Sequence, residues 1–469
     1  MNSDYPKASN ETKKILPLVL GTAIFMQMLD STILNTSLPA IAKELNESTL
    51  NMQNAVISYV LTLAIIMPIS GVLADKFGTK KVFLSSIVIF SLGSIFCSLS
   101  QNLTQLVISR VIQAVGGSLM VPVGKLALIR TFDKSELLKA MNYAIIPALI
   151  GPVLGPLVGG YMVDYLSWHW IFLINVPISL IGIVLALKYM PEYKSTYIDF
   201  DVKGFFIFGG ASLSLSISLE FMGNAKNITP VLLIILLGFF LIYQYYRHAK
   251  KDNNPIFPLD LFKVRTFRVG ILGNLATRLG ISSVPLLVPL MIQIAYGQSA
   301  VVSGWIVAPM AITAMFGKSA VIKILDKYGY RSTLMVNTMI IGLLICALGI
   351  PGVHDSIYVF IPLLALLGFF NSIQFTSMNT ISIADLRPYH TSSGNSFVAV
   401  NQQLAIGFGT AFGLIILKIF EGDTKLIHDE IHNAFRYTFF IIGFLTIVSG
   451  VVFRRLHSKD GDNLKTEHH

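Results

Sequence analysis

The sequence predicts an all-α integral membrane protein made of two six-helix halves, with two extra transmembrane helices between them. Three observations predict this fold class: an apolar composition, a series of long apolar runs, and a short charged motif that occurs twice. Of the 469 residues, 54% are hydrophobic and 13% are charged, whereas soluble chains carry about 25% charged residues. Too few polar side chains remain to cover soluble domains. The composition therefore excludes a cytosolic enzyme, a disordered scaffold and a disulfide-stapled secreted module.

The apolar runs are long enough to cross a membrane as helices. A helix needs about 20 apolar residues to span the hydrocarbon core, and by this measure the chain contains about fourteen spans. We expect the spans to begin near Ile15, Asn51, Val82, Leu103, Leu137, Trp168, Lys203, Thr229, Arg268, Ala300, Ser332, Ile357, Ser393 and Ala434.

Lysine and arginine are concentrated in every second connection between the expected spans. The basic connections and chain ends contain, among others, Lys13, Lys14, Lys76, Lys80, Lys81, Arg130, Lys134, Lys188, Lys194, Arg247, Lys250, Lys251, Lys323, Lys327, Arg387, Arg454 and Arg455. Cytoplasmic loops of membrane proteins are rich in these residues. We therefore expect both termini to be cytoplasmic, which requires an even number of spans. The net charge of +10 then reflects topology, and we expect no nucleic acid partner.

A repeated motif predicts how the spans are organised. Residues 75–80 (DKFGTK) are echoed by residues 326–331 (DKYGYR), and each copy follows what would be the second span of a half. The sequence therefore predicts an N-terminal six-helix half over 1–200, two inserted helices over 201–250, a C-terminal six-helix half with a preceding interfacial helix over 251–460, and a cytoplasmic tail over 461–469. Repeated halves with a binding site at their interface are typical of secondary transporters.

The repeated turns are candidate gates. In the first copy, Gly71 permits close helix contact, Asp75 can cap or pair locally, and Gly78 allows a backbone turn that other residues avoid. A simpler interpretation is a positively charged turn that only fixes topology. The second copy favours a paired gating hinge, formed by Gly71, Asp75, Gly78 and Lys80 in one half and by Asp326, Gly329 and Arg331 in the other.

These motifs, in this order, resemble those of the major facilitator superfamily, and most closely its fourteen-helix drug:proton antiporters of bacterial inner membranes. Residues 71–81 (GVLADKFGTKK) are similar to the superfamily's loop signature and residues 106–117 (LVISRVIQAVGG) to its fourth-helix motif. Residues 29–39 (LDSTILNTSLP) and 151–160 (GPVLGPLVGG) resemble the antiporters' first-helix and fifth-helix motifs. Residues 168–177 (WHWIFLINVP) resemble the start of their sixth helix, with His169 where arginine is more usual. The resemblance covers essentially the whole chain.

Asp30 and Arg110 are the principal candidates for proton coupling. Asp30 lies about fifteen residues into its span, where a carboxylate costs about 2.5–3.5 kcal/mol to insert and is normally paired, hydrated or functional. Arg110 is embedded in the fourth span and is its natural counter-charge. A static ion pair that holds helices together is the alternative. The resemblance implies that Arg110 acts in proton coupling and Asp30 in coupling or cation recognition, with Asn35 and Gln113 in the same cavity.

The fifth-span motif places small residues at intervals of four together with prolines. Small residues let helix backbones approach closely, and prolines favour a bend. The resemblance implies a packing role that seals one side of the cavity against leak, and this motif is more typical of exporters than of importers. The residues concerned are Gly151, Pro152, Gly155, Pro156, Gly159 and Gly160.

The later spans contain polar residues whose role stays open at this stage. Arg278 lies near the centre of its span and is expected either to line the cavity or to tie helices together. Asn371, Gln374 and Asn401 can form hydrogen bonds between helices or face substrate.

We expect no cofactor, no metal site and no ATP-driven step. Residues 317–319 (GKS) end like a phosphate-binding loop, but Ile312 stands where that loop requires glycine. The leading hypothesis is a monomeric, proton-driven antiporter of the inner membrane that exports amphipathic drugs or related small molecules by alternating access. A proton-coupled importer of a metabolite on the same fold is the first alternative. A membrane sensor or an enzyme is disfavoured, since no signalling domain or catalytic arrangement is visible in the sequence.

Overall fold

The computed structural model describes residues 9–194, 200–222, 229–387, 390–421 and 428–461. Within these ranges every regular element is a helix, and thirteen helical segments are long and apolar enough to cross a membrane. One of them, α13 (Ala300–Leu348), has 49 residues and contains Gly329 with a non-helical φ of 71°. A straight helix of that length would extend about 73 Å, more than twice the thickness of the hydrocarbon core. With α13 counted as two crossings, the predicted all-α fold of about fourteen spans is confirmed.

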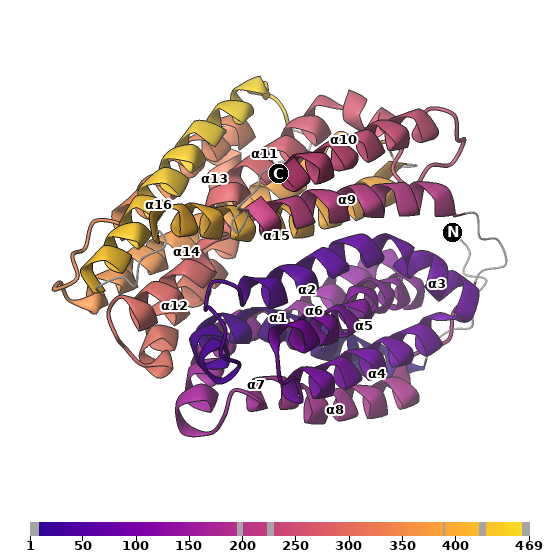
Figure 1. Ribbon diagram of the computed structural model, residues 1–469. Helices are drawn as coiled ribbons and strands as arrows, with labels where there is room; N and C mark the ends of the chain where they lie inside the picture. Colours follow the sequence, from indigo (N-terminus) through magenta and orange to yellow (C-terminus); the bar gives the residue numbers. More distant parts are fainter. Residues whose placement is uncertain (1–8, 195–199, 223–228, 388–389, 422–427, 462–469) are drawn as a thin grey trace. The chain divides into compact units, whose positions relative to one another are not determined.

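The chain divides into two compact units, residues 1–200 and 201–469. Figure 1 draws the first unit in indigo to magenta and the second in the later colours of the bar. The finer predicted boundaries, which separate an inserted pair over 201–250 from a half over 251–460, stay predictions.

The first unit consists of helices that give six spans. They are α1 (Asn10–Glu44), α2 (Gln53–Ile66), the 3₁₀ turn η1 (Met67–Ile69), α3 (Ser70–Phe77), α4 (Thr79–Ser98), α5 (Leu103–Thr131), α6 (Lys134–Tyr165), α7 (Trp170–Leu173) and α8 (Asn175–Tyr189). The α2–η1–α3 run and the α7–α8 run each form one span. Within the unit, α1 packs on α6 and α8, and α5 packs on α2 and α4.

Two glycines bring α4 and α5 unusually close together. A Cβ placed on Gly93 would lie 2.5 Å from the Cα of Gln113, and one on Gly116 would lie 2.5 Å from the carbonyl oxygen of Ser86. Only glycine fits at such backbone crossings, as in other membrane helix pairs. The close approach brings short side chains of α4 within hydrogen-bond reach of α5.

The second unit begins with a helical pair and continues with the remaining spans. Its helices are α9 (Val202–Met222), α10 (Thr229–Ala249), the 3₁₀ helix η2 (Leu259–Lys263), α11 (Arg265–Ile281), α12 (Val284–Ile294), α13, the 3₁₀ turn η3 (Ile357–Val359), α14 (Phe360–Ile383), α15 (Thr391–Glu421), α16 (His428–Ser449) and the 3₁₀ helix η5 (Gly450–Arg455). The short η2 lies where an interfacial helix was predicted, and its interfacial position stays a prediction. Helices α11 and α12 together form one span.

The α9–α10 pair is fastened to the rest of its unit by polar and aromatic contacts. Asp201 caps α9 by accepting a hydrogen bond from the Gly204 amide at 2.6 Å, and it also contacts His248 at the end of α10 at 2.7 Å. An aromatic cluster continues from this pair to η2, α11 and α15, and comprises Phe208, Tyr245, Phe257, Phe262, Phe267 and Phe397.

The α4–α5 crossing gives a prediction about stability. Gly116→Ala should lower the free energy of unfolding by about 1–3 kcal/mol, because the added methyl group meets backbone atoms that cannot move aside. Gly182→Ala on α8 is the matched control, since its Cβ would have no neighbour nearer than 3.6 Å and alanine favours a helix. Thermal midpoints of the detergent-solubilised variants measure the difference. Equal midpoints for the two variants would contradict the close approach of α4 and α5.

Candidate functional site

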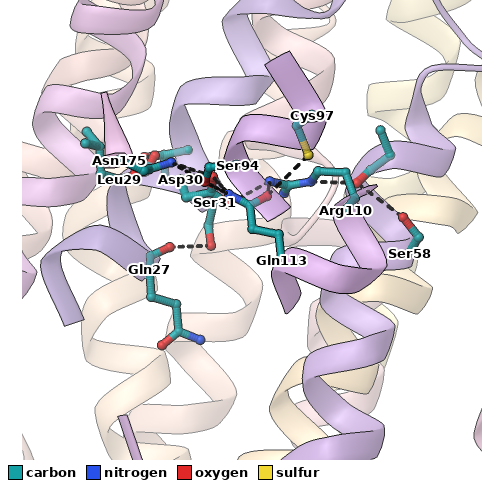
Figure 2. Close-up of polar contacts among 12 residues, drawn as sticks. Gln27, Leu29, Asp30, Ser31, Ser58, Ser94, Cys97, Arg110, Gln113 and Asn175 are labelled. Atoms are coloured by element: carbon teal, nitrogen blue, oxygen red, sulfur yellow. Dashed lines mark hydrogen bonds and ion pairs between the residues drawn. The ribbon is translucent and has the colours of Figure 1, made fainter. Parts of the chain in front are cut away.

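The centre of the candidate site is an ion pair between α1 and α5. An Arg110 terminal nitrogen lies 2.7 Å from Oδ2 of Asp30, and both residues are 1% exposed. Figure 2 shows the two side chains in the interior of the first unit, with further polar side chains around them. A buried charge is strongly destabilising unless it is paired and hydrogen-bonded. Neighbouring side chains must therefore form hydrogen bonds with the carboxylate oxygen and the N–H groups that the ion pair does not use.

Gln113 links the two charged groups and stands one turn beyond Arg110 on α5. Its amide nitrogen donates to Asp30 Oδ1 at 2.8 Å and to Ser94 Oγ on α4 at 2.7 Å. Its amide oxygen accepts from Arg110 at 2.6 Å. Gln113 thus uses both ends of its carboxamide to hold the acid and the base in one geometry. The Gly93 crossing described above makes the bond to Ser94 possible.

Asn175 and Ser94 complete the cluster, and the sequence did not single them out. The Asn175 amide nitrogen, at the first residue of α8, donates to Asp30 Oδ1 at 3.2 Å and to Ser94 Oγ at 3.4 Å. Asn175 Oδ1 is buried and has no hydrogen-bond partner in the described part of the chain. One sequence feature could have identified Asn175 as a site residue: it lies inside the motif at residues 168–177, which resembles the start of the antiporters' sixth helix.

Helix α2 supplies two further contacts of the guanidinium. The Arg110 Nε–H donates to the carbonyl oxygen of Ala55 at 3.2 Å, and the Arg110 Cζ lies 4.1 Å from the centre of the Tyr59 ring. A cation over an aromatic face is attracted by the ring quadrupole, most strongly where both groups are desolvated. The Arg110 Cζ also lies 5.8 Å from the centre of the Phe172 ring on α7. The charge of Arg110 is therefore balanced by groups from α1, α2, α7 and α5 itself.

This arrangement makes proton binding and geometry interdependent. Arg110, Gln113 and Asn175 all donate to the Asp30 carboxylate. A proton added to Asp30 would displace one of these donors and leave Arg110 without its counter-charge. Breaking one partner out of a buried pair is costly, so the neighbouring helices would have to rearrange.

The glycines of the fifth-span motif pack directly against the stretch of α1 that contains Asp30. A Cβ on Gly151 would lie 3.1 Å from the Leu29 amide nitrogen, and one on Gly155 would lie 3.1 Å from the Ile33 amide nitrogen. One on Gly159 would lie 2.6 Å from the Ile33 carbonyl oxygen. Three glycines at intervals of four therefore form a track on which α1 lies with its backbone against α6.

The other motif residues lie within the same helix. Pro152, Pro156 and Gly160 all fall inside α6, which the prolines do not interrupt in the described chain.

The candidate gate of the first unit is tied down by several contacts. Asp75 on α3 pairs with Arg130 at the end of α5 at 2.6 Å, and Lys80 donates to the Leu187 carbonyl oxygen at 2.6 Å. Gly78 turns the chain with φ of 101°. Gly71 has open space where its Cβ would be. From the sequence, Arg130 was expected only to contribute to the positive charge of a cytoplasmic connection.

The corresponding turn of the second unit repeats the backbone conformation. Gly329 has φ of 71°, so both glycines of the repeated motif occupy the region that favours glycine. Asp326 is half-buried and Arg331 is exposed.

Asn35 lies apart from the ion pair. It follows Asp30 by five residues on α1, which rotates it about 140° around the helix axis. It is half-buried, and in the described chain no hydrogen bond joins it to the Asp30 cluster.

The remaining predicted residues belong to the second unit, where two of them form bonds between helices. Gln374 on α14 accepts from Asn337 at 2.8 Å and donates to Thr338 on α13 at 2.8 Å. Asn401 on α15 donates to the Ile271 carbonyl oxygen on α11 at 3.3 Å. Asn371 is half-buried on α14, and Arg278 is buried on α11.

Comparison with known proteins agrees with this geometry. The family model described as "Major Facilitator Superfamily" matches residues 20–410 and 270–468. The chain belongs to the major facilitator superfamily. It is therefore a membrane transporter and not an enzyme, and the predicted resemblance is confirmed.

Curated relatives extend over nearly the whole chain. A Haemophilus influenzae protein named "Probable transport protein HsrA" is 38% identical over 96% of this chain and 97% of its own length. The "Putative multidrug resistance protein MdtD" of Pectobacterium atrosepticum is 36% identical over 93% of this chain and 94% of its own length. That of Salmonella heidelberg is 37% identical over 95% of each chain.

Solved structures share the fold at low sequence identity. The POT family transporter PepTSo has a TM-score of 0.69 at 14% identity, and covers 94% of this chain and 97% of its own. A D-xylose-proton symporter has a TM-score of 0.68 at 15% identity, over 96% and 99% of the two chains.

The bridging position of Gln113 gives a second prediction. Gln113→Leu should lower the free energy of unfolding by about 2 kcal/mol, because donors and acceptors of the buried ion pair lose their partner. Gln105→Leu is the matched control on the same helix, where the side-chain amide lies at the exposed end and, among the described residues, bonds only to the Gln101 backbone. Thermal denaturation of both variants in detergent measures the effect. If Gln105→Leu lost as much stability as Gln113→Leu, Gln113 would have no special role in holding the Asp30–Arg110 pair.

Proposed function

We propose that this transporter is a proton-coupled antiporter that exports amphipathic small molecules. The observation that supports this most directly is the fully buried Asp30–Arg110 pair, whose carboxylate accepts three hydrogen bonds from two other helices. Embedded ionisable groups that face the interior of a helix bundle mark ion pathways in membrane proteins by default. Proton coupling requires at least an acid that can be protonated, and here that acid lies against a fixed positive charge.

In this proposal the proton acts by releasing Arg110. Protonation of Asp30 removes one acceptor from Arg110 or Gln113, and α1 becomes free to shift along the glycines of α6. Access to the substrate then alternates between the two sides of the membrane, as is usual for transporters with repeated halves. Loss of the proton on the other side of the membrane restores the ion pair and returns the protein to its starting state.

Two observations support export rather than import. The track of Gly151, Gly155 and Gly159 corresponds to the motif that resembles the one found in antiporters, and it packs against the helix that carries Asp30. The curated relatives from Pectobacterium and Salmonella are named as putative multidrug resistance proteins. The alternative is import of a metabolite on the same fold. A measurement of the direction of substrate transport would distinguish the two.

The proposed setting is the bacterial inner membrane, with both termini in the cytoplasm. The chain is a multi-pass membrane protein, and its basic connections alternate with connections that contain few lysines and arginines. The positive-inside rule assigns the basic side to the cytoplasm.

Replacement of the acid tests the coupling. Asp30→Asn keeps the shape of the side chain but cannot exchange a proton, so uphill extrusion driven by a pH gradient should fall by about tenfold or more. Substrate-driven proton movement in proteoliposomes measures this loss, with the substrate first identified by growth protection of a strain that lacks its own exporters. Asp355→Asn is the control, because Asp355 is exposed and its carboxylate, within the described ranges, accepts a hydrogen bond only from the Gly352 amide. Wild-type extrusion against a gradient by Asp30→Asn would contradict the proposal.

Reporter fusions test the orientation. A fluorescent protein fused after the last residue should fluoresce and an alkaline phosphatase fused there should be inactive, because the terminus is proposed to be cytoplasmic. The matched fusion at His354, between α13 and α14, should give the opposite pattern. Phosphatase activity at the C-terminus would overturn the assignment.

A further inference from the structure

The second unit contains a buried cation that is not paired with a carboxylate. Arg278 lies on α11 within the span Arg265–Ile294 and is 9% exposed. In the described ranges of the chain no acidic side chain forms an ion pair with it. Arg110, which is also buried, has its counter-charge at 2.7 Å. The two embedded arginines therefore have opposite electrostatic surroundings.

The contacts of Arg278 leave most of its donors unused. Its Nε–H donates to the Asn274 Oδ1 at 2.7 Å, and its Cζ lies 5.1 Å from the centre of the Phe375 ring on α14. The other four N–H groups of a guanidinium have no hydrogen-bond partner among the described residues, and their nitrogens keep accessible surface. Arg278 thus keeps four donors of its planar guanidinium without a partner in the described chain.

A role in tying helices together does not account for these contacts. Asn274 precedes Arg278 by four residues on the same helix, so their hydrogen bond connects α11 only to itself. The Phe375 contact is the one interhelical interaction of the charge in the described chain, and an apolar side chain could replace it. A cation placed in a membrane span for packing alone would cost about 2.5–3.5 kcal/mol of insertion free energy, with no interaction to compensate for it.

The face of α14 next to Arg278 has a composition suited to a ligand. Asn371, Phe375 and Asn379 follow one another at intervals of four and share one face of the helix, and all three are half-exposed. Asn379 Oδ1 accepts from Gln402 of α15 at 2.5 Å. The face therefore offers an amide, an aromatic ring and a second amide in a row, with the guanidinium over the ring.

We propose that Arg278 binds the anionic group of the transported compound, and that the substrates are amphipathic organic anions. A carboxylate matches the two parallel donors of a guanidinium, and a planar apolar body can lie along the Phe375 face between the two amides. A cationic compound would meet an uncompensated positive charge there. This inference rests on the proposed transport function and names the chemical class on which that function acts.

Three probes with the same aromatic body and different charge test the proposal. The probes are 2-naphthoate, 2-naphthalenemethanol and 2-naphthylmethylammonium, and their binding to the full-length protein in lipid nanodiscs is measured by calorimetry. Wild-type protein should bind the anion about tenfold or more tightly than the alcohol, and the ammonium compound most weakly. Arg278→Gln should remove the preference for the anion, whereas Arg278→Lys should keep part of it. Lys318→Gln, which removes one exposed positive charge from α13, should leave the preference unchanged.

Several outcomes would overturn the assignment. If the alcohol or the ammonium compound binds wild-type protein as tightly as naphthoate, or if none of the three binds, the substrate class is wrong. If Arg278→Gln does not fold, the preference for the anion is compared between wild type and Arg278→Lys. An equal preference in these two proteins would then contradict the assignment. Asp30→Asn should still prefer naphthoate to the alcohol, because Arg278 and not Asp30 supplies the charge that selects the anion. Naphthoate binding without any coupled proton movement would therefore contradict the proposed function and leave the role of Arg278 intact.

Discussion

The first unit is organised around the electrostatic requirement of one buried ion pair. Asp30 and Arg110 lie where water cannot solvate them, so each of the surrounding helices contributes a compensating group. Helix α5 provides Gln113, α8 provides Asn175, and α2 provides a carbonyl oxygen and an aromatic face. The glycines at the α4–α5 crossing serve the same requirement, because the short hydrogen bond from Gln113 to Ser94 needs backbones that approach closely. The ion pair thus determines which residues can occupy the interfaces around it.

The two units treat their embedded arginines differently, and this difference suggests a division of labour. In the first unit the positive charge is compensated from within the chain and is suited to exchange with a proton on Asp30. In the second unit Arg278 has no compensation among the described residues and is suited to a ligand that brings its own negative charge. Coupling and recognition would then use the same side-chain chemistry, with the counter-charge supplied by the protein in one case and by the substrate in the other.

The sequence predicted the fold well because membrane spans follow from local composition. The starts of the spans, the turn glycines Gly78 and Gly329, and the pairing of Asp30 with Arg110 all follow from hydropathy, charge and depth within a helix. The rotational facing of side chains could not be predicted in this way. Asn35 belongs to the same motif as Asp30 and yet lies on another side of α1, whereas Asn175 lies far away in the chain and contacts Asp30 directly. Which polar groups meet depends on how the helices are rotated about their axes, and hydropathy contains no information on that.

The central claim is that Asp30 exchanges its proton when substrate binds, and infrared difference spectroscopy measures this directly. Addition of a transported compound to the purified protein should cause loss of a protonated-carboxyl band. The same addition to Asp30→Asn should leave that region of the spectrum unchanged. A carboxyl band that does not respond to substrate, or that responds equally in the variant, would contradict the account.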